Sequence, residues 1–178
     1  MRKKSKKRNK MIGVALVIIV LLFGIITVKF IQYEKIIEDT ERTWLITQYG
    51  PRDVNSMFYT LYGGKGQLIV VDGGWTEDAD FVRQTIKEMG GKVDAWILTH
   101  PHQDHIGAFN AIYSDLQGIE IKEVYTVDMP SPKLCQERAH WDSVDTYNDF
   151  LDLNVKNLKY VYPGDELNIC GQIGRAHV

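Results

Sequence analysis

Cysteine is scarce in this sequence: Cys135 and Cys170 are the only two among 178 residues. Two thiols 35 positions apart match no metal-ligand spacing, so the cysteines indicate no zinc site. We interpret them as small buried hydrophobic side chains. A disulfide formed outside the cell is the alternative, because the sequence does not show whether their Cα atoms come close enough. Cysteine catalysis is disfavoured, since no base can be placed near Cys135. The sequence also has no internal repeat.

Basic residues are scarce too, once the first ten positions are set aside. Seven of the 21 basic residues fall within those ten, which leaves 14 against 23 acidic residues in the rest of the chain. An acidic body does not attract a phosphate backbone by charge alone. Nucleic acid is therefore a possible partner that the charge disfavours.

Charge is absent from residues 11–28, which read MIGVALVIIVLLFGIITV. Such a run is about long enough to cross a hydrocarbon core of roughly 30 Å as a helix. We predict a transmembrane anchor over residues 11–30, which would make the lipid bilayer a partner of the chain. The basic segment 1–10 would lie in the cytoplasm, with the body of the protein outside. A cleaved signal peptide is the alternative, which the bulky residues at the end of the run disfavour.

Beyond the predicted anchor, residues 31–42 read as a charged helical stalk, and a globular pattern begins at residue 43. Strands are predicted over 44–49, 57–62 and 67–71, and the glycine-rich turn 63–66 favours a hairpin. Helices are predicted over 77–89, 108–116 and 136–153, with strands over 93–98, 119–127, 158–162 and 167–169. Strands first, then alternating helices and strands, predict a sheet covered by helices, hence an α/β or α+β fold.

A dense group of metal-ligand side chains follows the predicted strand 93–98. Three of the five histidines occur within six residues, as His100, His102 and His105, and Asp104 lies among them. In an extended segment His100 and His102 point the same way and can grip one ion. Asp104 and His105 come as the chain turns toward a helix, so they can reach a second ion. Imidazole and carboxylate ligands suit zinc, with manganese or iron also possible.

The segment 99–107, THPHQDHIG, resembles the HxHxDH signature of hydrolases with the metallo-β-lactamase fold. Asp72-Gly73-Gly74 resembles the Asp-Gly motif that ends an upstream strand in that fold. The form of the first motif is most similar to the extracellular hydrolase domain of competence DNA-uptake proteins and their relatives. The resemblance implies an αββα fold, of which residues 43–172 would be the N-terminal half to two-thirds.

The resemblance also implies roles for individual residues. His100 and His102 would bind one metal ion, and Asp104 and His105 the other, with Asp104 also orienting the attacking water or carrying a proton. Asp72 would support the site from behind by a hydrogen bond to a ligand histidine. The alternative for Asp72 is that it caps a turn.

Further ligands of this family come from later in the chain, where only two histidines remain. His140 falls in the predicted helix 136–153, and we expect it to be a surface or cleft-edge residue. Residues 173–178 read like the translation of a common sequencing adaptor, so we expect His177 to carry no meaning and the natural sequence to stop near residue 172.

The sequence therefore predicts a membrane-anchored hydrolase outside the cytoplasm, in which one or two zinc ions activate water. A phosphodiester or related ester is the favoured substrate, and a β-lactam or thioester stays open. The alternatives are a non-catalytic binding module of the same fold, tethered to the membrane, and an inactive gene fragment.

Overall fold

The computed structural model describes residues 2–41, 43–50 and 57–175. The chain divides into two compact units, Met1–Thr43 and Trp44–Val178. Each unit is described by itself.

The first unit is one helix, α1 (Arg2–Glu41). It takes in most of the predicted basic segment, anchor and stalk without a break. Nowhere in the part of the chain that the structure describes is a helix both long and apolar enough to cross a membrane. The predicted transmembrane anchor over 11–30 is therefore not supported.

The second unit is built on a six-stranded sheet with the order β1-β2-β3-β5-β7-β8. Its strands are β1 (Trp44–Tyr49), β2 (Phe58–Gly63), β3 (Leu68–Val71), β5 (Ala95–Leu98), β7 (Val124–Val127) and β8 (Leu158–Val161). The first three pair antiparallel, and β3, β5, β7 and β8 run parallel. The parallel strands therefore all end at the same edge of the sheet.

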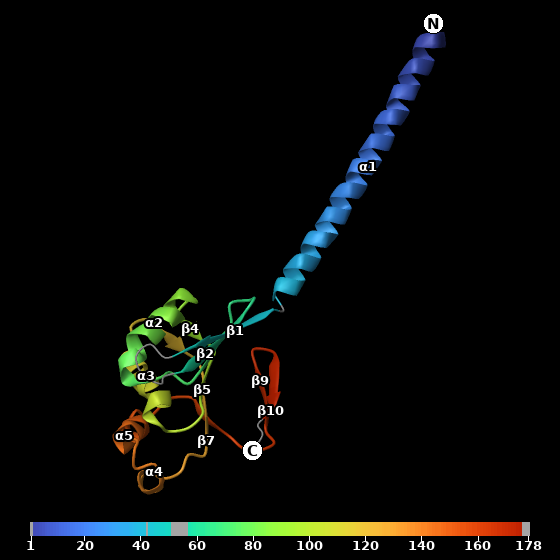
Figure 1. Cartoon of the computed structure of the whole chain (residues 1–178). Helices are drawn as coiled ribbons and strands as arrows, with labels where there is room; N and C mark the ends of the chain where they lie inside the picture. Colours follow the sequence, from blue (N-terminus) through green and yellow to red (C-terminus); the bar gives the residue numbers. More distant parts are fainter. Residues whose placement is uncertain (1, 42, 51–56, 176–178) are drawn as a thin grey trace. The chain divides into compact units, whose positions relative to one another are not determined.

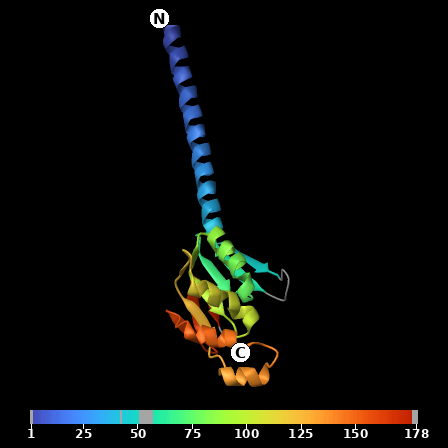
Figure 2. The same ribbon diagram turned by 90° about the vertical axis from the view of Figure 1, so that its left-hand side faces the viewer.

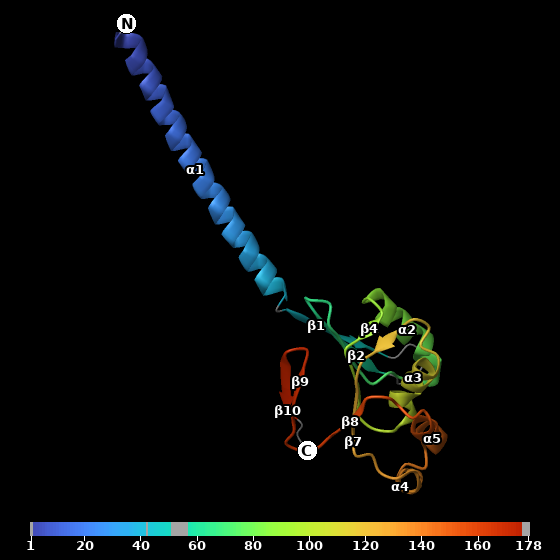
Figure 3. The same cartoon turned by 180° about the vertical axis from the view of Figure 1, so that it is seen from behind.

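Helices cover one face of this sheet (Figures 1 and 2). They are the 3₁₀ turn η1 (Thr76–Asp78), α2 (Ala79–Glu88), α3 (Gln103–Ser114), α4 (Pro132–Arg138) and α5 (Val144–Asp152). The hairpin of β9 (Glu166–Ile169) and β10 (Gln172–Arg175) lies on the other face, as Figure 3 shows from behind. A small parallel pair, β4 (Lys92–Val93) and β6 (Glu120–Ile121), extends the strand segments that lead into β5 and β7.

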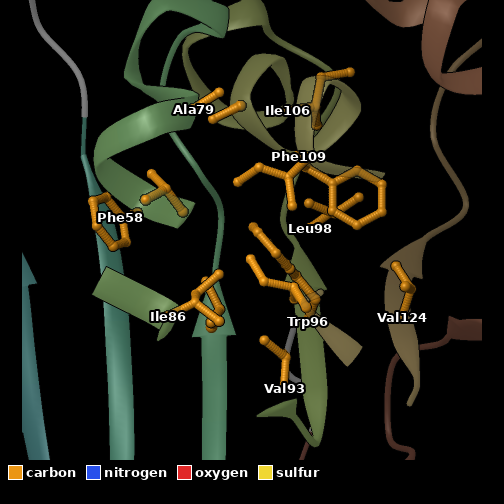
Figure 4. Packing of buried hydrophobic residues seen from close by; sticks show 14 of the residues in the cluster. Phe58, Ala79, Ile86, Val93, Trp96, Leu98, Ile106, Phe109 and Val124 are labelled. Carbon is orange, nitrogen blue, oxygen red and sulfur yellow. The ribbon is translucent and has the colours of Figure 1, made fainter. Parts of the chain in front are cut away.

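The main core lies between the helices and the sheet (Figure 4). Trp96 of β5 and Phe109 of α3 are both fully buried, and their rings meet edge to face with centroids 5.1 Å apart. Ile106 and Ile112 lie three residues to either side of Phe109, so one face of α3 is buried along its length. This packing holds α3 against the end of β5. A second, smaller cluster around Ile69 and Tyr125 lies on the hairpin side, where Leu167 and Ile169 cover it.

The strand predictions over 44–49, 57–62 and 67–71 are confirmed within a residue, and their hairpin is present. The predicted helix 136–153 is wrong, because it divides into α4 and α5. Ser143 begins α5 by accepting a hydrogen bond from the Asp145 amide, and Ala139 leaves helical geometry. The predicted helix 108–116 begins five residues earlier, at Gln103. The predicted strands 93–98 and 119–127 are each interrupted, and β10 was not predicted.

Both cysteines are free thiols, so the pairing alternative is not realised in the structure. Each is partly exposed, which corrects the prediction that they are buried.

Candidate metal site

The candidate site lies where the parallel strands β3 and β5 end. Asp72 follows β3, and Thr99 and His100 follow β5. The chain then turns into α3 at Gln103, so Asp104 and His105 lie in the first helical turn. Ligands commonly bind at this edge of an α/β sheet, because the strands hold the chain rigidly where the loops begin.

Asp72 connects three of these segments. Its side chain is 7% exposed, and Oδ2 accepts a hydrogen bond from His105 Nδ1 at 2.8 Å. Oδ1 accepts a hydrogen bond from the backbone N–H of Thr99 at 2.9 Å. The backbone carbonyl of Asp72 accepts the indole N–H of the buried Trp96 at 2.9 Å. One carboxylate therefore ties the end of β3 to the end of β5 and to the start of α3.

The backbone of Asp72 has a positive φ of 56°. Aspartate tolerates this left-handed conformation better than most residues, and such geometry gathers at functional sites. Asp72 is therefore not a simple surface turn residue.

The Thr99 hydroxyl forms a hydrogen-bonded bridge between Asp72 and His100. The Thr99 hydroxyl lies 2.8 Å from Asp72 Oδ2 and 2.9 Å from His100 Nδ1. An ionised carboxylate can only accept, so the hydroxyl donates its proton to Asp72. His100 Nδ1 then carries the proton that the hydroxyl oxygen accepts. By the same reasoning His105 donates from Nδ1 to Asp72.

Both histidines are thus held in the tautomer whose Nε2 has a free lone pair, which is the atom a metal ion needs.

The three imidazole rings lie close together. The His100 ring centroid is 3.8 Å from that of His105 and 4.7 Å from that of His102. His105 Nε2 is 3.6 Å from Asp104 Oδ2. Two ligands on one tetrahedral zinc ion, each bound at about 2.1 Å, lie about 3.4 Å apart, so this pair has the spacing of atoms that share an ion.

The cluster shifts the pKa values of two of its histidines in opposite directions. Burial and the neighbouring His105 and His102 lower the pKa of His100, against the attraction of Asp72 and Asp104. For His105, burial acts to lower the pKa, but the hydrogen bond and charge of Asp72, together with the charges of Asp104 and Asp142, raise the pKa overall. The hydrogen bond and the negative charge of Asp72 therefore favour the protonated form of His105.

The imidazole and carboxylate groups of this cluster are ligand types that zinc accepts, and Asp104 and His105 have the spacing of two ligands on one ion. Within residues 2–41, 43–50 and 57–175, no group of three or more His, Cys, Asp or Glu side chains is arranged to hold one ion. The prediction assigns only two of these ligands to each ion, His100 with His102 and Asp104 with His105, so it stays a prediction. Imidazole and carboxylate side chains are nevertheless gathered at one loop, and His100 and His105 have the tautomer that metal binding requires. The chemistry of this set of ligands suits zinc.

Two further contacts support the first turn of α3. Asp142, from the segment between α4 and α5, lies 3.4 Å from the backbone N–H of Gln103. Gly107 lets η1 come close, because a Cβ atom there would lie 2.5 Å from the backbone nitrogen of Thr76. Asp142 had no signal in the sequence. Thr99 stands beside the histidine motif, but its bridging role depends on Asp72, which is distant in the sequence.

Of the two remaining histidines, His140 lies in the described part of the chain. His140 is exposed, and its ring contacts Trp141 at 5.2 Å between centroids, in keeping with the surface position predicted for it. His177 is outside the described residues.

A sequence model of the metallo-beta-lactamase superfamily matches residues 49–134 of this chain. That segment contains Asp72 and all four predicted metal ligands. This segment therefore resembles the metallo-beta-lactamase superfamily. The predicted α/β class is confirmed by the mixed sheet and the helices that cover it. These matches give no support to the narrower resemblance to competence DNA-uptake proteins.

Curated proteins to which the chain is similar carry the name hydroxyacylglutathione hydrolase. The protein from Aliivibrio fischeri (strain MJ11) is 29% identical over 121 residues, which cover 66% of this chain and 46% of the relative. The protein from Photobacterium profundum is 28% identical over 131 residues, covering 71% and 50%. The chain thus spans about half the length of the curated relatives it matches.

Metallo-beta-lactamases are among the solved structures to which the chain is similar. SMB-1, bound to 2-mercaptoethanesulfonate, superposes with a TM-score of 0.49 at 19% identity, covering 78% of this chain and 54% of SMB-1. The enzyme from Staphylococcus aureus subsp. aureus COL gives a TM-score of 0.42 at 12% identity, covering 72% and 32%.

Proposed function

We propose that this protein is a metal-dependent hydrolase in which His100, His102, Asp104 and His105 hold one or two zinc ions. Manganese and iron are the alternatives that the same ligands accept. The observation that carries the proposal is the chain of contacts from His105 through Asp72 and Thr99 to His100. A buried carboxylate that fixes the tautomers of two neighbouring imidazoles is expected at a metal site and not in a surface loop that binds no metal.

A bound zinc ion supplies hydroxide at neutral pH by lowering the pKa of its water to about 7. Residues around the site hold the metal-binding side chains in position. Asp72 fixes the His105 ring, Thr99 fixes the His100 ring, and the first turn of α3 presents Asp104. With its side chain 31% exposed, Asp104 is accessible to a water molecule, which it orients or whose proton it accepts.

The substrate we propose is an acyl compound whose carbonyl carbon the hydroxide attacks. The relatives named hydroxyacylglutathione hydrolase support this choice. Phosphodiesters are the second candidate, because the motif resembles that of nucleic-acid-uptake hydrolases. The excess of acidic residues beyond the first ten positions disfavours long polyanions.

The test is a hydrolysis assay of the protein stripped with EDTA and then reloaded with zinc. We expect zinc-dependent hydrolysis of S-lactoylglutathione and slower or no hydrolysis of bis-p-nitrophenyl phosphate. The reverse preference would favour the phosphodiester hypothesis. If zinc binds but neither substrate is cleaved, the non-catalytic binding module is the better account.

Asp104→Asn should lower the rate by about 10²-fold or more, as expected for a group that handles a proton in the reaction. Asp115→Asn is the matched control, because Asp115 is exposed at the opposite end of α3. Equal rates in the two variants would contradict the role assigned to Asp104.

A further inference from the structure

Helix α1 exposes apolar side chains that the proposed hydrolase site does not use (Figure 1). Among its described residues, fifteen large hydrophobic side chains are exposed, and six of them are consecutive, at residues 18–23. Six consecutive positions cover more than one helical turn, so apolar side chains face every side of the helix there. Phe23 is 72% exposed and Ile26 is 65% exposed. Surface of this kind is unfavourable in water.

The one polar side chain in residues 11–28 forms its hydrogen bond within the helix. That residue is Thr27, whose Oγ1 donates to the backbone carbonyl of Phe23 at 2.8 Å. An apolar medium accepts a helix whose polar groups are bonded internally, because no hydrogen bond to water has to be given up. The stretch around Phe23 and Thr27 is therefore suited to contact with hydrocarbon.

The charge that precedes this stretch has one sign. Seven of the first ten residues are basic, and no acidic residue comes before Glu34. Anionic lipid headgroups attract such a segment, and the attraction grows with the number of Lys and Arg residues. A basic segment followed by an apolar one matches the two layers of a lipid surface, in which charged headgroups cover acyl chains.

A lipid surface accounts for these features better than a second copy of the chain does. Paired helices bury an apolar stripe and keep their other sides polar, whereas residues 18–23 are apolar on every side. Two parallel copies would also bring together two groups of seven positive charges. Nucleic acid would suit the basic segment, but it would leave the apolar side chains in water.

We propose that α1 binds the surface of a lipid bilayer that contains anionic lipids. The basic residues of segment 1–10 bind the headgroups, and the apolar side chains around Phe23 enter the acyl region from one side. Such binding does not require a helix that crosses the bilayer, and the described part of the chain contains none. Because α1 forms a compact unit of its own, the binding depends neither on zinc nor on the proposed hydrolase activity.

The test is a flotation assay of the full chain with lipid vesicles. Vesicles of phosphatidylcholine mixed with phosphatidylglycerol should bind the protein at least about tenfold more tightly than vesicles of phosphatidylcholine alone. Added salt should weaken binding to the mixed vesicles. Removal of zinc with EDTA should leave it unchanged.

The apolar contribution is tested by the double variant Phe23→Ser/Ile26→Ser. It should bind the mixed vesicles at least about tenfold more weakly, because two large apolar side chains no longer enter the lipid. Trp141→Ser/Leu151→Ser is the matched control, since these side chains of the second unit are 70% and 49% exposed. The control should bind as the wild type does.

The contribution of charge is tested by replacing four lysines of the basic segment with glutamine. The preference for the mixed vesicles should fall at least about threefold in K3Q/K4Q/K6Q/K7Q. An unchanged preference would overturn the proposal, as would absence of flotation, equal binding to both kinds of vesicle, or equal losses in the apolar variant and its control. A dimer that depends on Phe23 and Ile26 and binds no vesicles would assign the apolar surface to a second copy instead.

Discussion

The Oδ2 atom of Asp72 lies 2.8 Å from Nδ1 of His105, although 33 residues separate them in the sequence. The contact joins the end of β3 to the first turn of α3, and Thr99 extends it to His100. The predicted hydrogen bond between Asp72 and a histidine of the motif is thus present, and metal binding itself stays a prediction that the following experiments test.

Asp72→Asn should weaken zinc binding by about 10- to 100-fold, the usual effect of losing a residue that orients a metal ligand. Asparagine tolerates the positive φ at this position, so the fold should persist. Its amide can donate to His105 Nδ1, which would move the histidine proton to Nε2 and block the metal-binding atom. Affinity is measured by competition with a chromophoric chelator, and Asp115→Asn is the control. An unchanged zinc affinity in Asp72→Asn would contradict the proposed role.

Phe109→Ala should destabilise the second unit by about 3–5 kcal/mol, as for other large aromatic residues removed from a core. Phe109 is fully buried against Trp96, Tyr113 and Phe150. The free energy of unfolding is measured by urea denaturation. Leu151→Ala is the matched control, because Leu151 is 49% exposed and should lose far less. Equal losses in the two variants would show that α3 is not held by this core.

Gly107→Ala should also destabilise the fold, by about 1–3 kcal/mol, although alanine is the better helix former. The added Cβ would meet the backbone nitrogen of Thr76 at 2.5 Å and the backbone carbon of Trp75 at 3.0 Å. Backbone atoms cannot move aside as a flexible side chain can. Gly50→Ala is the control, since no atom of the described residues lies within 4 Å of its Cβ position. A stabilised Gly107→Ala would show that η1 does not pack so closely on α3.

Asp94 should give the protein a stability that is lost in acid. Burial acts to raise its pKa, but hydrogen bonds from Lys122 and the Leu68 amide, with the charges of Lys122 and Lys92, outweigh burial and lower the pKa. A lowered pKa means that the folded state favours ionised Asp94. Its contribution is therefore complete above the ordinary pKa of about 4, and it disappears as the pH falls through the lower folded value.

The measurement compares urea unfolding of the wild type and Asp94→Asn between pH 3 and pH 6. The wild type should be the more stable protein at pH 6, and the difference should shrink toward pH 3. A difference that is the same at every pH would mean that the charge of Asp94 does not contribute.

Local sequence patterns predicted the strands well where hydrophobic residues and turns were clearly marked. Strand β1 and the hairpin of β2 and β3 follow from runs of β-forming residues around a glycine-rich turn. The division of residues 136–153 was missed, although Ser131 followed by Pro132 is a recognisable helix start and Ser143 is a second cap. The hydrophobic run 11–28 predicted an anchor that the structure does not support.

The sequence predicted the proposed metal ligands of the site but not all of the contacts that support them. His100, His102, Asp104 and His105 stand together in the sequence, so their density alone indicated a metal. The contacts of Asp72 with Thr99, and of Asp142 with Gln103, join residues 27 and 39 positions apart, and only the folded chain brings them together. Asp72 could be named beforehand through a family resemblance, whereas Asp142 could not.

The most direct test of the account compares zinc binding by the wild type and by the double variant His102→Ala/His105→Ala. Both proteins are stripped with EDTA, and zinc binding is then measured by calorimetry. His140→Ala is the matched control, because His140 is an exposed histidine outside the cluster. The account predicts that the wild type and the control bind zinc equally, and that the double variant binds at least about tenfold more weakly. Zinc binding that is unchanged in the double variant would contradict the assignment of a metal site to the end of β5.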